Sequence, residues 1–285
     1  MYERMSPNKW QKVLYKDQGV PDNYVDESFL RELKNKVTLY DLPYVIVESG
    51  VVTQQISSIC LFVVLFIYME QELLLPVNLL YINAALSLLG YAAHDIVDGG
   101  QDRKESSRSR LDDLKSTAIF VAFSYGLSPI LKTLTDTIST DTIYAMTVFM
   151  LLGNLLFHDY ASAETRARRS VSLNASIFAS VCLASRLPST LHAFATVTVA
   201  MQLFALWPEL RRKLKVHFPR TQIPLTLGSS LIALCAVASV SHVGAIILIL
   251  VHLAVTFLVP ICLIRLQQFK NNIHGPWDEA VIQHS

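Results

Sequence analysis

The chain has 285 residues, of which 52% are hydrophobic and only 16% are charged. Soluble domains carry about 25% charged residues, and here the charges are gathered between long apolar runs, which excludes a single soluble core. This alternation is typical of a polytopic membrane protein. The formal net charge of +1 says little about binding partners, and no nucleic-acid partner is predicted.

The chain begins with a polar segment, residues 1–43, for which no cleavable signal peptide is predicted. Within it, Phe29, Leu30, Leu33 and Val37 fall on one helical face. This spacing predicts a short amphipathic helix that lies on the membrane surface or on a partner. The alternative is a frayed polar tail with scattered aromatic residues. We expect the segment to lie in the cytosol.

Eight apolar runs follow, each about the length of a membrane-crossing helix. We expect spans at residues 44–68, 73–93, 116–131, 142–157, 171–188, 191–207, 223–240 and 245–266. Pro129 should kink or end the third helix, and Pro208 should end the sixth. The sequence therefore predicts an all-α integral membrane protein, a bundle of about eight transmembrane helices over residues 44–266 with a cytosolic tail, residues 267–285.

The distribution of basic residues tests this count of spans. If the N-terminus is cytosolic, five polar segments face the cytosol: residues 1–43, 94–115, 158–170, 209–222 and 265–285. Only Lys132 and Arg186, of the 24 Lys and Arg residues, then lie on the other side. Lys and Arg are enriched in cytosolic loops, and adding or dropping one helix would invert every later loop. We therefore expect both termini in the cytosol.

The fifth span is an apolar segment that carries several hydroxyls and one asparagine. Ser172, Ser176 and Ser180 recur at every fourth residue and form a row of small side chains. Such a row lets another helix approach closely, and Asn174 can hydrogen-bond across an interface. We predict that this span packs inside the bundle through these four residues. The alternative is that the serines are incidental.

Two basic clusters are candidates for contact with phosphate on the cytosolic side. Arg166, Arg168 and Arg169 lie in a short polar loop just before the fifth span, where a lipid headgroup would be met. The second cluster follows the sixth span and consists of Arg211, Arg212, Lys213 and Lys215. For any single one of these residues, a plain topology signal is the simpler interpretation.

Catalytic motifs are absent from the sequence: it has no P-loop, no Rossmann fingerprint, no HExxH and no GxSxG. His94-Asp95 and His158-Asp159 follow the second and fourth spans, and a His beside a carboxylate can act as a general base or hold a divalent ion. Residues just outside a span, however, are usually polar because they meet water and headgroups. The four cysteines lie in apolar runs without ligand spacing. We predict no catalytic residue, no metal site and no cofactor.

Several long segments resemble one family. They are WQKVLY and PDNYVDESFL near the start, DIVDGGQDRK after the second span, STDTIYAMTVFMLLG, SLNASIFASVCLASRLPS, FALWP and IRLQQFKNNIHGPWDEA. Over residues 10–280 the chain resembles the PIG-C family, the multi-spanning C subunits of phosphatidylinositol N-acetylglucosaminyltransferase. DGGQDR only partly resembles the motif of the CDP-alcohol phosphatidyltransferases, because the Ala-Arg and the later pair of aspartates are missing.

The resemblance implies a subunit of the endoplasmic reticulum complex that begins glycosylphosphatidylinositol (GPI) anchor synthesis. In that family the complex transfers N-acetylglucosamine from UDP-N-acetylglucosamine to phosphatidylinositol on the cytosolic face. The sugar transfer is attributed to PIG-A. The other implied partners are PIG-H, PIG-P, PIG-Q, PIG-Y and the regulatory subunit shared with dolichol-phosphate-mannose synthase. The family supplies no catalytic motif that maps onto this sequence.

The residues themselves agree with a non-catalytic role. A fold that holds the UDP diphosphate is built from α/β units, and no polar stretch of this chain is long enough to form one. We therefore expect a scaffold and a platform for the lipid substrate. The alternatives are a stand-alone membrane lipid transferase and a lipid transporter or flippase.

Overall fold

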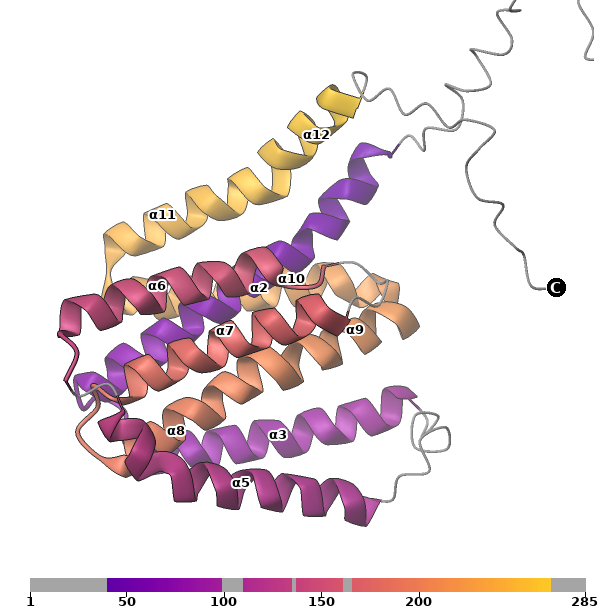
Figure 1. Ribbon diagram of the computed structural model, residues 1–285. Coiled ribbons are helices and arrows are strands. Elements are labelled where there is room, and N and C mark those ends of the chain that lie inside the picture. Colours follow the sequence, from indigo (N-terminus) through magenta and orange to yellow (C-terminus); the bar gives the residue numbers. More distant parts are fainter. Residues whose placement is uncertain (1–39, 99–109, 135–136, 161–165, 268–285) are drawn as a thin grey trace, which may run out of the picture. The chain divides into compact units, whose positions relative to one another are not determined.

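The computed structural model describes residues 40–98, 110–134, 137–160 and 166–267. The chain divides into two units, Pro43–Pro260 and the two chain ends. All regular elements of the described residues are helical (Figure 1). They are α2 (Leu42–Glu70), α3 (Pro76–Asp98), α5 (Arg110–Thr133), α6 (Thr140–Phe157), α7 (Arg166–Ala184), α8 (Thr190–Met201), the π-helix η1 (Gln202–Leu206), α9 (Trp207–His217), the 3-10 helix η2 (Pro219–Thr221), α10 (Gln222–Val240), α11 (His242–Leu253), the π-helix η3 (Ala254–Leu258) and α12 (Val259–Gln267).

Seven helices of the described residues are long and apolar enough to cross a membrane. They are Leu42–Glu70, Pro76–Val97, Leu111–Thr133, Thr140–Phe157, Thr190–His217, Pro219–Val240 and His242–Gln267. These correspond to seven of the eight predicted spans. The remaining one is α7, whose apolar part, Arg169–Ala184, is shorter. The all-helical fold is thus confirmed, whereas the count of eight spans and the side on which the termini lie stay predictions.

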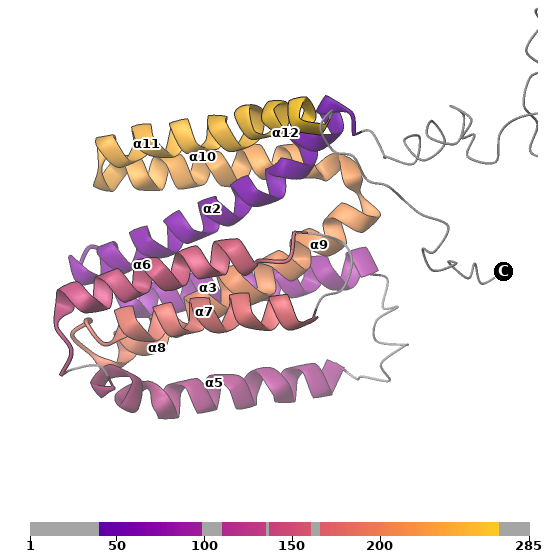
Figure 2. The same cartoon turned by 45° about the horizontal axis from the view of Figure 1, so that its top comes forward.

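Helix α7 lies at the centre of the unit Pro43–Pro260. It packs along α6 and against α8, and it also contacts α5 (Figures 1 and 2). In the apolar core, the rings of Phe62 and Phe204 meet edge to face at 5.4 Å between centroids. Leu151, Ala179 and Leu183 belong to the same buried cluster. The core thus joins the first half of the chain to the second.

The predicted end of the sixth span at Pro208 is wrong. Helices α8, η1 and α9 form one continuous helix that runs on to His217. A proline in an α-helix lacks the N–H that bonds four residues back, and its ring clashes with the carbonyl there. Here the π-turn of η1 lies directly before it, and Trp207 N–H bonds to Gln202 O five residues back. This wider turn accommodates Pro208, so residues 209–217 are helical and not a loop.

The same arrangement recurs at the C-terminal end of the unit. The π-helix η3 ends at Leu258, Val259 N–H bonds to Ala254 O, and Pro260 follows. Pro129 is accommodated differently, because α5 continues past it to Thr133. Pro129 has no N–H to donate to the carbonyl of Tyr125. That carbonyl instead accepts a hydrogen bond from Ser128 Oγ at 2.9 Å. The proline therefore does not end this helix.

Candidate functional site

Helix α9 presents Arg211 to the interior of the bundle. The Arg211 side chain is buried, with only 4% of the residue exposed. Its Nη1 donates to Gln54 Oε1 at 3.2 Å, and its Nη2 donates to Gln55 Oε1 at 2.9 Å. Both glutamines belong to α2 and are fully buried. A cation from one helix is thus held by two neutral amides of another.

The amide network continues from α2 into α6 and α7. Gln55 Nε2 donates to Asn154 Oδ1 at 2.8 Å. Asn154 Nδ2 in turn lies 2.9 Å from both Ser172 O and Ser172 Oγ, and the Ser172 hydroxyl donates to Asn154 O at 3.0 Å. All three residues are buried. The network therefore ties α2, α6, α7 and α9 together just inside the end of the bundle where α6 finishes.

A second branch of the network joins α2 to α10. Gln54 Nε2 donates to Thr226 Oγ1 at 2.7 Å. The two helices approach closely because residue 50 is a glycine: a Cβ at Gly50 would lie 2.8 Å from Thr226 Oγ1. Gly50 thus sets the separation of α2 and α10, which in turn positions Gln54 for Arg211.

In the part of the chain that the structure describes, the charge on Arg211 has no opposite charge close to it. Among the described residues, no carboxylate lies within the 4.0 Å of an ion pair, and its buried Nε–H has no hydrogen-bond partner. Burying an ion costs several kcal/mol unless hydrogen bonds or an opposite charge compensate. Here hydrogen bonds to the two glutamine oxygens compensate for this cost in part.

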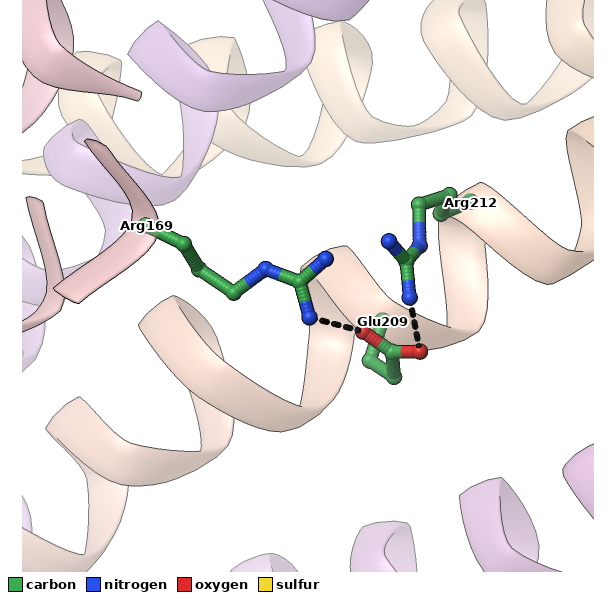
Figure 3. Close-up of polar contacts among 3 residues, drawn as sticks. All are labelled: Arg169, Glu209 and Arg212. Atoms are coloured by element: carbon green, nitrogen blue, oxygen red, sulfur yellow. Dashed lines mark hydrogen bonds and ion pairs between the residues drawn. The ribbon is translucent and has the colours of Figure 1, made fainter. Parts of the chain in front are cut away.

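On the opposite side of α9, Glu209 joins two arginines (Figure 3). Its Oε2 lies 3.5 Å from Arg169 Nη1 of α7, and its Oε1 lies 2.6 Å from Arg212 Nη2 on α9 itself. All three side chains are partly exposed, between 36% and 48%. The two basic clusters of the sequence therefore meet at one carboxylate, which we call the Glu209 clasp, meaning Arg169, Glu209 and Arg212.

The turn after α6 lies near both Arg211 and Arg169. His158 packs edge to face on Tyr160 at 5.0 Å between ring centroids, and the Tyr160 hydroxyl donates to Leu155 O at 2.6 Å. The pKa of His158 is lowered to about 4, first by burial and then by the charges of Arg211 and Arg169. Burial also raises the pKa of Tyr160. His158 is therefore neutral at physiological pH.

A cavity of about 370 Å³ lies further along α9, where this helix meets the ends of α2 and α10. Tyr44, Val47 and Pro219 form apolar walls, and Lys215 lines one side. Lys215 Nζ lies 2.5 Å from Glu48 Oε2. The cavity combines apolar walls with a charged rim, which are the two properties that an amphipathic molecule requires.

The three arginines predicted to lie in a loop lie instead in the first turn of α7. That prediction of a loop is wrong because α7 begins at Arg166, five residues before the expected span. The side chains of Arg166 and Arg168 are outside the described part of the structure. Arg169 is exposed and bonded to Glu209 as above. Headgroup contact by these residues stays a prediction.

The serine row of α7 is buried: Ser172 is 3% exposed, and Ser176 and Ser180 are fully buried. The hydroxyls of Ser176 and Ser180 donate within their own helix, to Leu173 O at 2.8 Å and Ile177 O at 2.6 Å. Asn174 lies on the exposed side of α7. The buried asparagine that bonds to α7 from another helix is Asn154, whereas Asn174 stays a candidate for contact outside this chain.

Other predicted residues lie apart from the network. His94 and Asp95 lie in the last turns of α3 and not in a loop. Among the residues of the network that the sequence interpretation left without a role are Gln54 and Gln55. Their signal was the adjacent amide pair within a predicted span, because polar residues inside a membrane helix usually face the bundle interior.

The fold and the site define an all-helical protein of membrane type, with a buried arginine–amide network and a basic surface at one end of its bundle. The chain belongs to the GPI2 family, described as phosphatidylinositol N-acetylglucosaminyltransferase, which it matches over residues 10–278. The family predicted from the sequence segments is therefore confirmed.

Relatives from animals and fungi match nearly the whole chain. The C subunit of phosphatidylinositol N-acetylglucosaminyltransferase from Rattus norvegicus is 53% identical over 277 residues, which cover 96% of this chain and 93% of that protein. The corresponding human protein gives the same values. The GPI2 subunit of Schizosaccharomyces pombe is 34% identical, with 95% and 86% covered. No solved structure matches this chain.

Proposed function

We propose that this chain is a non-catalytic membrane subunit of the complex that transfers N-acetylglucosamine from UDP-N-acetylglucosamine to phosphatidylinositol, the first step of GPI-anchor synthesis. The names of its relatives support membership, since each is called a subunit of phosphatidylinositol N-acetylglucosaminyltransferase. We place the protein in the endoplasmic reticulum membrane with both termini in the cytosol.

The role we propose is that of a scaffold and a platform for the lipid substrate. The observation behind it is the end of the bundle where α6 finishes and α7 begins. Arg169 and Arg212 form a basic surface there, while Arg211 and the buried amides hold α2, α6, α7 and α9 in a fixed arrangement. A rigid bundle with a basic rim suits a headgroup that bears phosphate.

The platform would meet phosphatidylinositol in two parts. Arg166, Arg168 and Arg169, in the first turn of α7, are the candidates for its phosphate. The apolar-walled cavity beside Tyr44 and Lys215 is a candidate for the part of a lipid next to its headgroup. Basic residues at a membrane surface attract anionic lipids, so the contact with the arginines would favour this lipid over a zwitterionic one.

The partners we propose are PIG-A, which would perform the chemistry, together with PIG-H, PIG-P, PIG-Q, PIG-Y and the regulatory subunit of dolichol-phosphate-mannose synthase. Asn174 of α7 is a candidate for contact with a partner helix, because it is exposed in the single chain and a polar side chain in a membrane favours a hydrogen-bonded neighbour. The buried serines of α7 contribute to the scaffold from inside.

Reconstitution tests this proposal. The chain purified alone in defined micelles should transfer no sugar from UDP-N-acetylglucosamine to phosphatidylinositol, whereas the chain expressed with the other subunits should co-purify with them in an active complex. Transfer by the isolated chain would make it a lipid transferase and would overturn the scaffold role. Lipid translocation by the chain alone in vesicles would favour the transporter instead.

A further inference from the structure

The Glu209 clasp brings together groups from two helices. Arg169 lies in the first turn of α7 and Arg212 on α9, and both reach the same carboxylate, at 3.5 and 2.6 Å (Figure 3). The three side chains are 48%, 37% and 36% exposed for Arg169, Arg212 and Glu209. A molecule that approaches this end of the bundle can therefore reach the guanidinium groups.

The clasp has the chemistry of a phosphate site that a carboxylate occupies. Each guanidinium presents a fork of N–H donors, and phosphate oxygens match this fork as carboxylate oxygens do. Glu209 offers one oxygen to each arginine, whereas a phosphate group has further oxygens and can bond both arginines. Exposed ion pairs contribute little to stability. Displacing Glu209 from its partners would therefore cost little.

The charges around the clasp also favour an added anion. Arg211 follows on α9 with its charge buried, and the two amide oxygens that it bonds are neutral. Arg169 and Arg212 thus share the Glu209 carboxylate, while Arg211 adds a third positive charge on the other side of α9. Burial weakens screening by water, so the field of Arg211 is felt nearby. The pKa of His158 is lowered first by burial and then by the charges of Arg211 and Arg169, so His158 lies within the field of both arginines.

We propose that the Glu209 clasp is a phosphate-binding site in which Glu209 holds the place of the anion, and that a phosphate group binds Arg169 and Arg212 by displacing this carboxylate. The chemistry is common to the phosphodiester of a phospholipid headgroup and to free phosphate. The lipid source rests on the proposed function; the site itself does not. Glu209 then sets the affinity of the site by competing with its ligand.

Binding to the full-length chain in maltoside micelles, which contain no phosphate, tests the site. Dioctanoyl phosphatidylinositol and inorganic phosphate are titrated separately by calorimetry into the wild type, Glu209→Gln and Arg212→Gln. Glu209→Gln should bind phosphate probes about fivefold more tightly, because the competing charge is gone. Arg212→Gln should bind about tenfold more weakly, and Arg212→Lys should lie between it and the wild type.

The matched control is Asp141→Asn. It removes an exposed carboxylate from the first turn of α6, at the end of that helix away from the clasp, and it changes the net charge equally. Tightening in Glu209→Gln but not in Asp141→Asn supports the clasp. Equal tightening in both, or none in Glu209→Gln, overturns it. Unfolding temperatures of all variants are measured alongside, and wild-type values are expected for Glu209→Gln.

The two probes separate this inference from the proposed function. If inorganic phosphate binds with the expected response to Glu209→Gln while phosphatidylinositol does not bind, the clasp is supported and the lipid platform is contradicted. If phosphatidylinositol binds with an affinity that neither Glu209→Gln nor Arg212→Gln changes, the lipid platform survives and the clasp is overturned.

Discussion

Arg211 and Arg212 are neighbours in the sequence, yet they lie in opposite environments. Arg211 is 4% exposed and is held by Gln54 and Gln55 inside the bundle. The side chain of Arg212 is 37% exposed and bonds Glu209 at the surface. One residue along a helix turns the side chain by about 100°, which is enough to move a guanidinium from the rim to the interior.

The difference separates two functions of positive charge. On the buried side, a cation with neutral partners fixes how four helices meet, and removing a partner leaves polar groups without hydrogen bonds. On the exposed side, the ion pairs are worth about 0–1 kcal/mol each, so they are free to exchange partners. We therefore expect mutations of the buried side to change stability and mutations of the exposed side to change activity.

Gln55→Leu should have the largest effect, because it removes the acceptor of Arg211 and the donor to Asn154 together. Hydrogen bonds to charged groups are worth about 1.5–3 kcal/mol, and unpaired buried groups add to the loss. We expect the free energy of unfolding to fall by about 3 kcal/mol, measured by thermal unfolding in detergent. Gln71→Leu, at an exposed position of the turn after α2, should stay close to the wild type and is the control.

Ser180→Leu should have the next largest effect. Ser180 is fully buried in α7, and inserting a large side chain into a packed interior costs roughly 1–3 kcal/mol. The same unfolding assay should show this loss, and pull-downs should recover fewer partner subunits. Val171→Leu, on the same helix at a position 48% exposed, should change neither result. Equal behaviour of the two variants would mean that α7 is not closely packed at Ser180.

The sequence predicts the helices well because each is marked by an apolar run, and seven of the eight predicted spans lie on long apolar helices. It fails where a local rule is overridden. Pro208 predicts a helix end, but the preceding π-turn lets the helix continue. Such a turn depends on packing at a distance, including the contact of Phe204 with Phe62, which the local sequence does not contain.

The wrong prediction of a helix end at Pro208 also prevented the prediction of the buried Arg211 site. With residues 209–217 taken as a loop, Arg211 had no preferred direction and was grouped with Arg212. If the helix is continued instead, Trp207, Leu210, Arg211 and Leu214 follow the i, i+3, i+4, i+7 spacing of an inward stripe. The sequence therefore contained the signal for a buried arginine. Its partners on α2 required the structure, because they are 156 and 157 positions away.

The exposed side is tested by changing Arg166, Arg168 and Arg169 together to Gln. If they contact the phosphate of the lipid, transfer by the assembled complex at limiting phosphatidylinositol should fall about tenfold, as expected for the loss of charge-assisted hydrogen bonds. Subunit recovery and unfolding should not change. Lys115→Gln, which removes an exposed charge from α5, is the control. Unchanged activity of the triple variant would mean that these arginines only help to set the orientation of the helix in the membrane.

The remaining prediction concerns His158, which lies near both sides of the comparison. Its pKa is about 4 in the folded chain against an ordinary 6.5, lowered by burial and by Arg211 and Arg169, and Tyr160 packs edge to face on its ring. Between these values the unfolded chain binds a proton that the folded chain does not. Stability is therefore fully present above pH 6.5 and falls as the pH drops toward 4.

His158→Gln isolates this contribution. The wild type should lose more stability than the variant when the pH is lowered from 7 to 5, because the other titrating groups are common to both chains. Thermal unfolding at the two pH values measures the difference. If phosphate binds at the Glu209 clasp, the added negative charge should raise the pKa of His158, and the difference between the chains should shrink when phosphate is present. A difference that phosphate leaves unchanged would separate His158 from the exposed side and assign its low pKa to burial and Arg211.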